Sequence, residues 1–481
     1  MSRSAVALAI LGVYAILGWF LWRRLARRAA IDAVRRFRAR IDHFKLTGKP
    51  YITDALLADD VIAAAVRAHA ADHGISAAAT WPLVRRYVDE IVPVFNLLAY
   101  YQFGITASRS LLHLFYKVEV QHVRQGSFGE LPRESIVIYL MNHRSNADYV
   151  LAGYALAGQV AISYAVGEWA RVFPLEHIFK AFGAYFIRRR FREPLYHAVL
   201  ERYVQLITRN GVTQGIFPEG GLSRDGKLRP AKIGLLDYAL GVAREPGFAA
   251  RMYLVPVAIN YDRVLEDRSL LRELHATEGH RPPGRLSQLR EVTGYLFRNL
   301  WRLAARRWKR YGQAAVVIGE PLRLAPWFEG LEREGGGLFT LDRVARLREV
   351  QELADEAMRR VGEIIPVTPV PLVCAAIQTL DADFISRSAL LERIAEVRQS
   401  LVHHGRRVLE PQEAAGETMD LAFALLRPRH VIARDGEGYV ILPRGREVIS
   451  YYANSIAHLL GEFEKAVRAR DALPVYAAVD L

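Results

Sequence analysis

The order of apolar and polar residues divides the chain into regions of different periodicity. Apolar positions recur at helical spacing between residues 23 and 130, for example in "WPLVRRYVDEIVPVFNLLAYYQFG". From about residue 131 to residue 325, short apolar runs alternate with helical stretches. After the glycine-rich "REGGGLF" the helical pattern returns and continues to the C-terminus. We therefore predict an α/β fold whose mixed, largely buried sheet is flanked by helices, with helical N- and C-terminal regions.

The predicted strands are short, apolar and bounded by turns. They cover residues 135–141, 161–167, 184–189, 213–218, 253–259 and 314–319. Pro256 interrupts one of these apolar runs, and because proline cannot donate to a ladder, we expect an edge position or a bulge there. The changes of pattern predict four units, which are residues 1–30, 31–130, 131–330 and 331–481.

An uncharged apolar run over residues 5–22 is just long enough to cross a bilayer. Basic residues follow at 23–40, which predicts an N-terminal membrane anchor helix in the cell (inner) membrane with the rest of the chain on the cytoplasmic side. A cleaved signal peptide is the alternative, but its charge would lie before the apolar run and a small-residue cleavage site would follow it. Residues 91–118 fit either a second membrane contact or a buried core helix.

Composition narrows the classes of partner and chemistry. The chain of 481 residues is 51% hydrophobic and 24% charged, with a net charge of +14, which suits a folded protein that meets anionic partners. The pattern contains no nucleic-acid recognition motif, so we expect no nucleic-acid partner. The single cysteine, Cys374, lies in an apolar run and is expected to be a buried thiol. No metal-binding motif is present, and we predict no metal site.

The stretch "YLMNHRSNADYVLAGYAL" places His143 five residues before Asp148. Residues at this spacing do not share a face of one helix, but a turn from a strand into a helix allows the aspartate to fold back on the imidazole. A carboxylate bonded to one ring nitrogen would leave the other free to take a proton from a hydroxyl. Ser145 and Asp148 also match a helix capping box, and the two interpretations are compatible.

Three further stretches carry residues suited to anion binding. "GAYFIRRR" ends a predicted strand in three arginines, which bind phosphate through paired N–H groups. "FPEGGLSRDGKLRPAKIG" is a glycine-rich turn whose amides could face an anion or a developing oxyanion. "LVPVAINYDRV" contains the proline strand.

These four stretches, in this order and spacing, resemble the four blocks of the glycerolipid acyltransferase family. "NHRSNAD" resembles its H-x4-D motif, "GAYFIRR" and "FPEGGLSR" its middle blocks, and "LVPVAINY" its proline block. The arginine after His143, the "EGGxSRxGKL" pattern and "YYANSIAHLL" near the C-terminus are most similar to bacterial glycerol-3-phosphate 1-O-acyltransferases. One departure is Leu222, where that branch usually has arginine.

The resemblance implies transfer of a fatty acyl group from acyl-CoA or acyl carrier protein to the 1-hydroxyl of sn-glycerol 3-phosphate. The product would be lysophosphatidate, the first step of phospholipid synthesis. The thioester is a co-substrate, no cofactor is expected, and membrane lipids are expected partners. Two alternatives are a lysophosphatidate acyltransferase and a basic membrane-surface scaffold without activity.

The resemblance also implies roles for particular residues. His143 would be the general base, and Asp148 would orient it. The implied phosphate ligands are Arg188, Arg224, Lys232 and Arg144, the pocket and oxyanion residues are Glu219, Gly220, Gly221 and Ser223, and Pro256 would line the acyl side. An acyl-enzyme route through Ser145 is disfavoured, because its hydroxyl lies on the predicted cap and no second base is evident.

Overall fold

The computed structural model describes residues 48–94, 105–124, 131–132, 134–156, 162–167, 176, 179–180, 183–188, 191–276, 310–380, 382–409 and 414–471. No helix among these residues is long and apolar enough to span a membrane. The predicted anchor at residues 1–30 lies outside them, as do residues 95–104 of the possible second contact.

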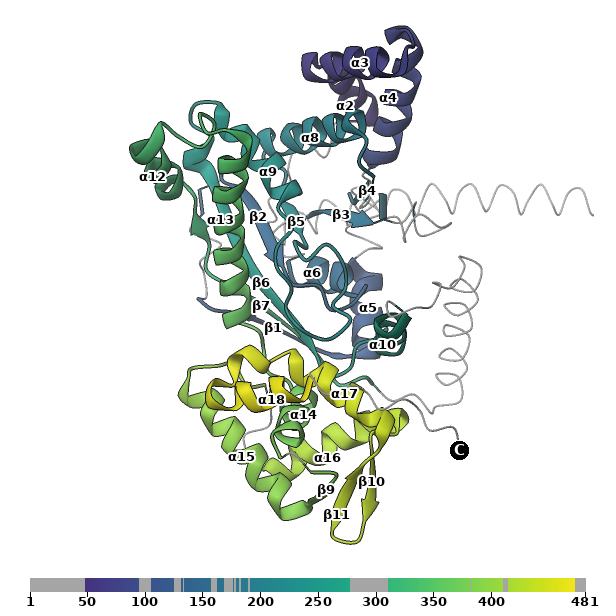
Figure 1. Cartoon of the computed structure of the whole chain (residues 1–481), viewed down its shortest axis with the longest axis vertical. Coiled ribbons are helices and arrows are strands. Elements are labelled where there is room, and N and C mark those ends of the chain that lie inside the picture. The colour runs from purple at the N-terminus through teal and green to yellow at the C-terminus, as the bar shows by residue number, and fades with distance from the viewer. Residues whose placement is uncertain are drawn as a thin grey trace, which may run out of the picture.

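A mixed sheet of eight strands forms the centre of the chain (Figure 1). Its order is β1-β7-β6-β2-β5-β3-β4, and β8 pairs with β6. The bounds are β1 Lys117–His122, β2 Ile136–Met141, β3 Ser163–Gly167, β4 Tyr185–Ile187, β5 Gln214–Ile216, β6 Met252–Tyr261, β7 Gln313–Ile318 and β8 Leu322–Arg323. Every predicted strand is therefore confirmed. The helical prediction over residues 23–130 is wrong at β1, because this strand pairs in parallel with β7, nearly 200 residues away.

Helices lie on the sheet and at both of its ends (Figure 1). Those within or before the sheet region are α2 Lys49–Leu57, α3 Asp60–His73, α4 Ala77–Ile91, α5 Ile105–Phe115, α6 Asp148–Leu156, α8 Pro194–Arg209, α9 Gly234–Leu240, α10 Asp267–Ala276, α12 Ala325–Gly335 and α13 Arg343–Glu363. The helix α13 packs against β2 and β6. All six residues of β2 are buried, as expected for an apolar strand covered on both faces.

The position of Pro256 differs from the prediction. It lies in β6, between β2 and β7, opposite Leu140 and away from the sheet edge. The Pro256 carbonyl accepts from the Gly319 backbone N–H at 2.8 Å, so the proline nitrogen faces the same side of the strand. There the chain passes from β7 to β8, and no ladder bond requires a donor from residue 256. An interior proline is tolerated because it falls at this gap.

The C-terminal region surrounds one apolar helix. The helix α14 Pro369–Thr379 is buried along nearly its whole length and packs against α15 Arg387–His403, α16 Ala415–Leu426, α17 Pro443–Asn454 and α18 Glu464–Asp471. The prediction of helices is confirmed for these elements. It missed a small antiparallel sheet of β9 Phe384–Ser386, β10 Ile432–Asp435 and β11 Gly438–Ile441. The turn between β10 and β11 is the Gly436-Glu437 pair, a glycine-containing hairpin signal.

Asp262 joins the central sheet to the C-terminal helices. Its buried carboxylate accepts from the backbone N–H of Gln313 at 2.7 Å and of Val370 at 3.0 Å. Val370 lies in the first turn of α14, so Asp262 caps this helix from the end of β6. Burial raises the pKa of Asp262 to about 6. Because the folded state binds this proton more tightly than the unfolded state does, protonation of Asp262 stabilises the fold. That stabilisation is fully present below the pKa of the unfolded state and is lost as pH rises through about 6.

We predict that Asp262→Ala lowers the free energy of unfolding by about 3 kcal/mol at pH 8, because two buried backbone N–H groups lose their acceptor. Chemical denaturation measures the change. Asp72→Ala is the matched control, since Asp72 is exposed, and it should leave the midpoint nearly unchanged. Equal effects of the two substitutions would contradict the capping role of Asp262.

Candidate active site

The site is built on the turn between β2 and α6. Beyond the end of β2, the Asn142 side chain continues the pairing with β6: it donates to the carbonyl of Ile259 and accepts from the Ile259 N–H, both at 2.8 Å. Asn142 is fully buried, so water does not compete for these bonds. The start of the turn is therefore fixed to the sheet immediately before His143.

His143 and Asp148 meet across this turn. The imidazole Nδ1 lies 2.9 Å from Asp148 Oδ2, and because a carboxylate can only accept, Nδ1–H is the donor. The same oxygen accepts from the backbone N–H of Arg144 at 2.6 Å and of Ser145 at 2.9 Å. His143 is 1% exposed and Asp148 is 0% exposed. The predicted contact between the two side chains is confirmed.

The capping interpretation holds in part. Asp148 accepts the Ser145 N–H, which is one half of a capping box. The Ser145 hydroxyl instead accepts from Ala147 N–H at 3.0 Å and donates to Glu266 Oε2 at 2.7 Å. Glu266 also accepts from Asn146 N–H at 3.2 Å. A carboxylate therefore stands beside Ser145, contrary to the expectation that no second base lies near it.

Aromatic rings surround the imidazole. Phe217 stacks on it with ring centroids 4.4 Å apart, and Tyr149 meets it edge-on at 5.3 Å. Among the described residues, no hydrogen bond reaches His143 Nε2. With Nδ1 committed to Asp148, Nε2 is the nitrogen that can accept a proton from a bound hydroxyl.

Glu219 joins the glycine-rich loop, residues 217–234, to the turn of residues 142–148, which is called the catalytic turn below for its candidate base His143. One carboxylate oxygen accepts from His143 N–H at 2.7 Å and the other from Arg229 N–H at 3.2 Å. On the other side, Ser223 N–H donates to the His143 carbonyl at 3.1 Å. Burial raises the pKa of Glu219 to about 7, against the opposing effect of Arg144. The backbone of His143 is thus held from both sides by residues 217–229.

Two of the predicted phosphate ligands are engaged by other groups. The Arg144 guanidinium is buried, donating to the Gly226 carbonyl and, at 3.2 Å, to the Ser455 carbonyl. Arg188 forms a two-pronged ion pair with Glu90 of α4, with N–O distances of 2.8 and 2.7 Å.

Arg188 also lies over three aromatic rings. Its guanidinium carbon is 4.7 Å from the ring centroid of Phe191, and the rings of Tyr87 and Tyr196 lie at 5.5 and 5.6 Å. The Glu90 contact raises the pKa of Arg188 above its ordinary value. This arrangement fixes Arg188 between the sheet and the N-terminal helices.

The remaining predicted site residues occupy the glycine-rich loop and the sheet. Arg224 is partly exposed, and its Nε forms an ion pair with Glu273 Oε2 at 3.2 Å. Lys232 is exposed, its side chain passes over Gly220, and its amine has no partner in the described part of the chain. Gly220 has a φ of +69°. Ser223 is buried and donates to the Lys227 carbonyl at 2.7 Å, Gly221 is half-buried, and Pro256 lies inside the sheet.

The end of α17 closes against the same loop. Asn454 Nδ2 donates to the Asp225 carbonyl at 2.9 Å. Gly226 has a φ of +83°, and a Cβ at this position would lie 1.9 Å from the Tyr451 carbonyl oxygen. Together with the Arg144–Ser455 bond, these contacts bring the sequence "YYANSIAHLL" to the catalytic turn.

Tyr261 and Glu266 belong to the site but were missed in the sequence. The Tyr261 hydroxyl donates to Asp148 Oδ1 at 2.6 Å. Tyr261 ends the proline strand, so its place at a strand's carboxyl end was the available signal. Glu266 lies in a loop after that strand, and no local pattern marks it.

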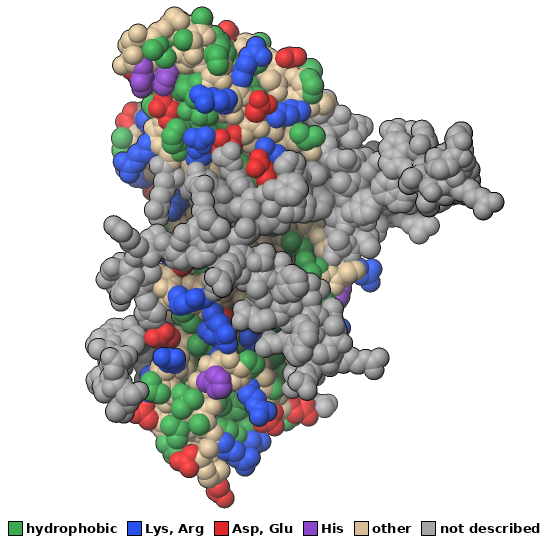
Figure 2. All heavy atoms as spheres, turned by 90° about the vertical axis from the view of Figure 1, so that its right-hand side faces the viewer, with side chains coloured by type: hydrophobic (Ala, Val, Ile, Leu, Met, Phe, Trp, Pro, Cys, Tyr) green, Lys and Arg blue, Asp and Glu red, His purple; other side chains and the backbone are tan. Residues whose placement is uncertain are grey.

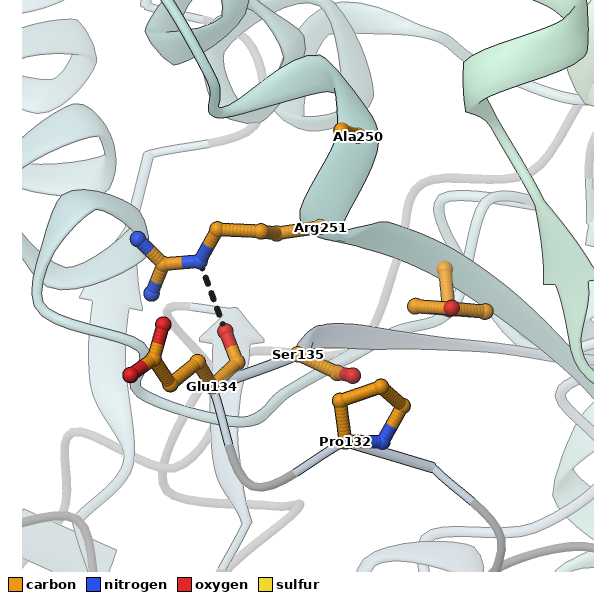
Figure 3. A pocket seen from close by; sticks show the side chains of 6 residues that line it. Pro132, Glu134, Ser135, Ala250 and Arg251 are labelled. Carbon is orange, nitrogen blue, oxygen red and sulfur yellow. Dashed lines mark hydrogen bonds between the residues drawn. The ribbon is translucent and has the colours of Figure 1, made fainter.

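A surface hollow of about 360 Å³ lies at the opposite end of the strands. Pro132, Glu134, Ser135, Ala250, Arg251 and Tyr253 line it (Figure 3). Arg251 Nε donates to the Glu134 carbonyl at 2.9 Å, bridging the segments that lead into β2 and β6. The hollow adjoins the amino ends of these strands, whereas His143 follows the carboxyl end of β2. It is therefore separate from the catalytic turn.

Two family models match successive parts of the chain. Residues 123–260 match the Acyltransferase model, and residues 294–462 match the model for the glycerol-3-phosphate acyltransferase C-terminal region. A glycerol-3-phosphate acyltransferase of Haemophilus influenzae (strain PittEE) is 28% identical over 67% of this chain and 39% of its own. One of Xylella fastidiosa (strain M12) is 27% identical over 91% of this chain and 50% of its own. The chain is therefore similar in sequence to glycerol-3-phosphate acyltransferases.

The chain spans about half the length, or less, of the curated proteins it matches. The solved 1-acyl-sn-glycerophosphate (LPA) acyltransferase of Thermotoga maritima is 21% identical, over 54% of this chain and 76% of that chain, with a TM-score of 0.29. The first family match includes the catalytic turn and the glycine-rich loop, and the second includes α17. The two matched regions contact each other where Gly226 faces the Tyr451 carbonyl and where Arg144 donates to the Ser455 carbonyl.

We predict that Gly226→Ala lowers the free energy of unfolding by about 2 kcal/mol or more, because the positive φ and the Tyr451 carbonyl both exclude a side chain. Chemical denaturation measures it. Gly234→Ala is the matched control: a Cβ there meets nothing within 4 Å, so this variant should be neutral or slightly more stable. If Gly226→Ala behaved like the control, the close packing of α17 on the loop would be wrong.

Proposed function

We propose that this chain transfers an acyl group from an acyl thioester to the 1-hydroxyl of sn-glycerol 3-phosphate. The observation that carries the proposal is the buried contact of His143 Nδ1 with Asp148 at 2.9 Å, which leaves Nε2 available as a base. The match to the glycerol-3-phosphate acyltransferase C-terminal region and the names of the relatives support glycerol 3-phosphate as the acceptor.

The proposed reaction is a direct transfer. His143 Nε2 takes the proton of the 1-hydroxyl while the hydroxyl oxygen bonds to the thioester carbonyl carbon. The carbon–sulfur bond then breaks, and the imidazolium returns its proton to the leaving thiolate. Asp148 holds the imidazole in orientation and stabilises its positive charge throughout.

The glycine-rich loop supplies the groups for the charged parts of the substrates. We propose that the Gly221 amide faces the developing oxyanion and that Lys232 and Arg224 hold the phosphate. The Gly220 N–H donates to the Phe217 carbonyl at 3.1 Å, so it would join Gly221 only after releasing that bond. Lys232 suits this role because its exposed amine lies beside Gly220. Arg224 would have to exchange its ion pair with Glu273 for the phosphate, and Arg188 would contribute only if it parted from Glu90.

The acyl donor and the cellular site extend the same proposal. The donor is acyl-CoA or acyl carrier protein, and the reaction takes place at the cytoplasmic face of the inner membrane, among membrane lipids. The apolar run at residues 5–22 and the basic residues after it support the membrane site. Figure 2 shows basic side chains interspersed with acidic ones at both ends of one face. The basic residues that are drawn there in colour therefore do not form one continuous patch, and the membrane proposal does not rest on them.

The test is an assay of the full chain with both donors and with either glycerol 3-phosphate or lysophosphatidate as acceptor. Wild type should acylate glycerol 3-phosphate, and His143→Ala should lose at least about 100-fold in kcat/KM because the base is gone. His403→Ala is the matched control, since this histidine is exposed, and it should keep full activity. Turnover of lysophosphatidate alone, or a fully active His143→Ala, would overturn the proposal.

We predict that Lys232→Ala raises the KM for glycerol 3-phosphate about tenfold or more, because a charged hydrogen bond to phosphate is lost. Initial-rate kinetics at varied acceptor concentration measure the effect, and the KM for the thioester should stay constant. Lys465→Ala, which changes an exposed lysine of α18, controls for the loss of charge. An unchanged acceptor KM in Lys232→Ala would move the phosphate site elsewhere.

A further inference from the structure

The two oxygens of the Asp148 carboxylate have different partners. Oδ2 accepts from the His143 ring and two backbone N–H groups, whereas Oδ1 accepts from the Tyr261 hydroxyl at 2.6 Å. This distance is typical of a charge-assisted O–H···O⁻ bond. Tyr261 and Asp148 are both 0% exposed, so bulk water does not compete for Oδ1. The side chains of Tyr261 and His143 thus donate to opposite oxygens of one carboxylate.

The sheet holds Tyr261 in place. It is the last residue of β6 and pairs with Ala314 of β7, while its backbone N–H donates to Asn260 Oδ1 at 3.0 Å. Its ring packs against Tyr116, with centroids 5.2 Å apart. Burial and the nearby carboxylate raise the pKa of the Tyr261 hydroxyl well above its ordinary value, so the group remains a donor throughout the working pH range.

We propose that Tyr261 is a positioning residue that lowers the proton affinity of the His143–Asp148 pair and thereby sets the pH range in which His143 can act as a base. A hydrogen bond to the ionised carboxylate stabilises the negative charge of the pair. If the Tyr261 hydroxyl is removed, the negative charge on Asp148 Oδ1 loses this stabilisation. The pair of His143 and Asp148 then binds a proton more tightly. The inference rests on the proposed function, in which the deprotonated pair is the active form.

Other charged and titratable groups also face the pair. Glu266 lies on the loop before α10, Glu219 accepts from the His143 N–H, and Tyr149 of α6 meets the imidazole edge-on. Arg144 lies in the turn itself, with its guanidinium on the Gly226 and Ser455 carbonyls, and Tyr451 comes from α17. Tyr116, which precedes β1, packs against the Tyr261 ring and donates its hydroxyl to the Arg263 carbonyl. Tyr261→Phe leaves all of them in place and removes a single oxygen atom. A change in the proton affinity of the pair therefore reports the lost hydrogen bond.

We predict that Tyr261→Phe moves the acid limb of the pH profile of kcat/KM upward by about one pH unit. The loss of the Tyr261 hydrogen bond destabilises the unprotonated pair. The limb therefore moves upward whether the added proton resides on His143 or on Asp148. Tyr116→Phe is the matched control: it removes a buried hydroxyl that donates to the Arg263 carbonyl at 2.8 Å, so its limb should coincide with that of wild type.

A second readout does not need activity. The titration of His143, followed by ¹³C NMR of histidine-labelled protein and assigned with His143→Ala, should shift upward in Tyr261→Phe and stay in place in Tyr116→Phe. Unshifted curves in folded Tyr261→Phe, even with a lower kcat, would reduce Tyr261 to a packing residue and overturn the inference. A wild type that does not acylate glycerol 3-phosphate would instead overturn the proposed function, while the NMR titration still decides the role of Tyr261.

Discussion

The geometry of the site depends on the hydrogen bonds that the buried carboxylate of Asp148 accepts. In the described structure it receives hydrogen bonds from the His143 ring, the backbone N–H groups of Arg144 and Ser145, and the Tyr261 hydroxyl. The backbone bonds shape the turn, and the ring bond fixes the tautomer of His143. A buried carboxylate is stable only when its oxygens are satisfied in this way. The same bonds that compensate for burial therefore orient the imidazole of His143.

Elements far apart in the sequence hold this turn in place. Glu219 and Ser223 fix the backbone of His143 from the glycine-rich loop, and Arg144 ties that loop to the end of α17. Asp262 adds a second link, from β6 to the start of α14. The C-terminal helices α14, α17 and α18 consequently lie next to one end of the sheet region (Figure 1), and the bond from Arg144 to the Ser455 carbonyl places part of this boundary at the catalytic turn. The regions that the two family models match therefore contact each other in the described structure.

Local patterns were sufficient for six strands of the central sheet and for the contact of His143 with Asp148, because a strand followed by a turn and a helix determines that contact. They missed β1, β8 and the small sheet of β9, β10 and β11. They were insufficient wherever a distant residue decides the outcome. Pro256 lies inside the sheet because a gap between β7 and β8 faces it. Arg188 looked free to bind phosphate, but Glu90, 98 residues earlier, engages it. Tyr261 meets Asp148 across 113 residues. Such pairings follow from sheet order, which short-range periodicity does not encode.

In the proposed mechanism His143, held by Asp148, activates the acceptor hydroxyl for direct attack on the thioester. The structure also places Glu266 beside the Ser145 hydroxyl, so direct transfer and an acyl-enzyme route can be compared on one protein. The most direct measurement is the intact mass of the protein during a single turnover with acyl thioester and glycerol 3-phosphate. Direct transfer predicts that ester product accumulates while the protein mass stays constant. An acyl adduct on Ser145 that forms and decays at the rate of product formation would contradict it.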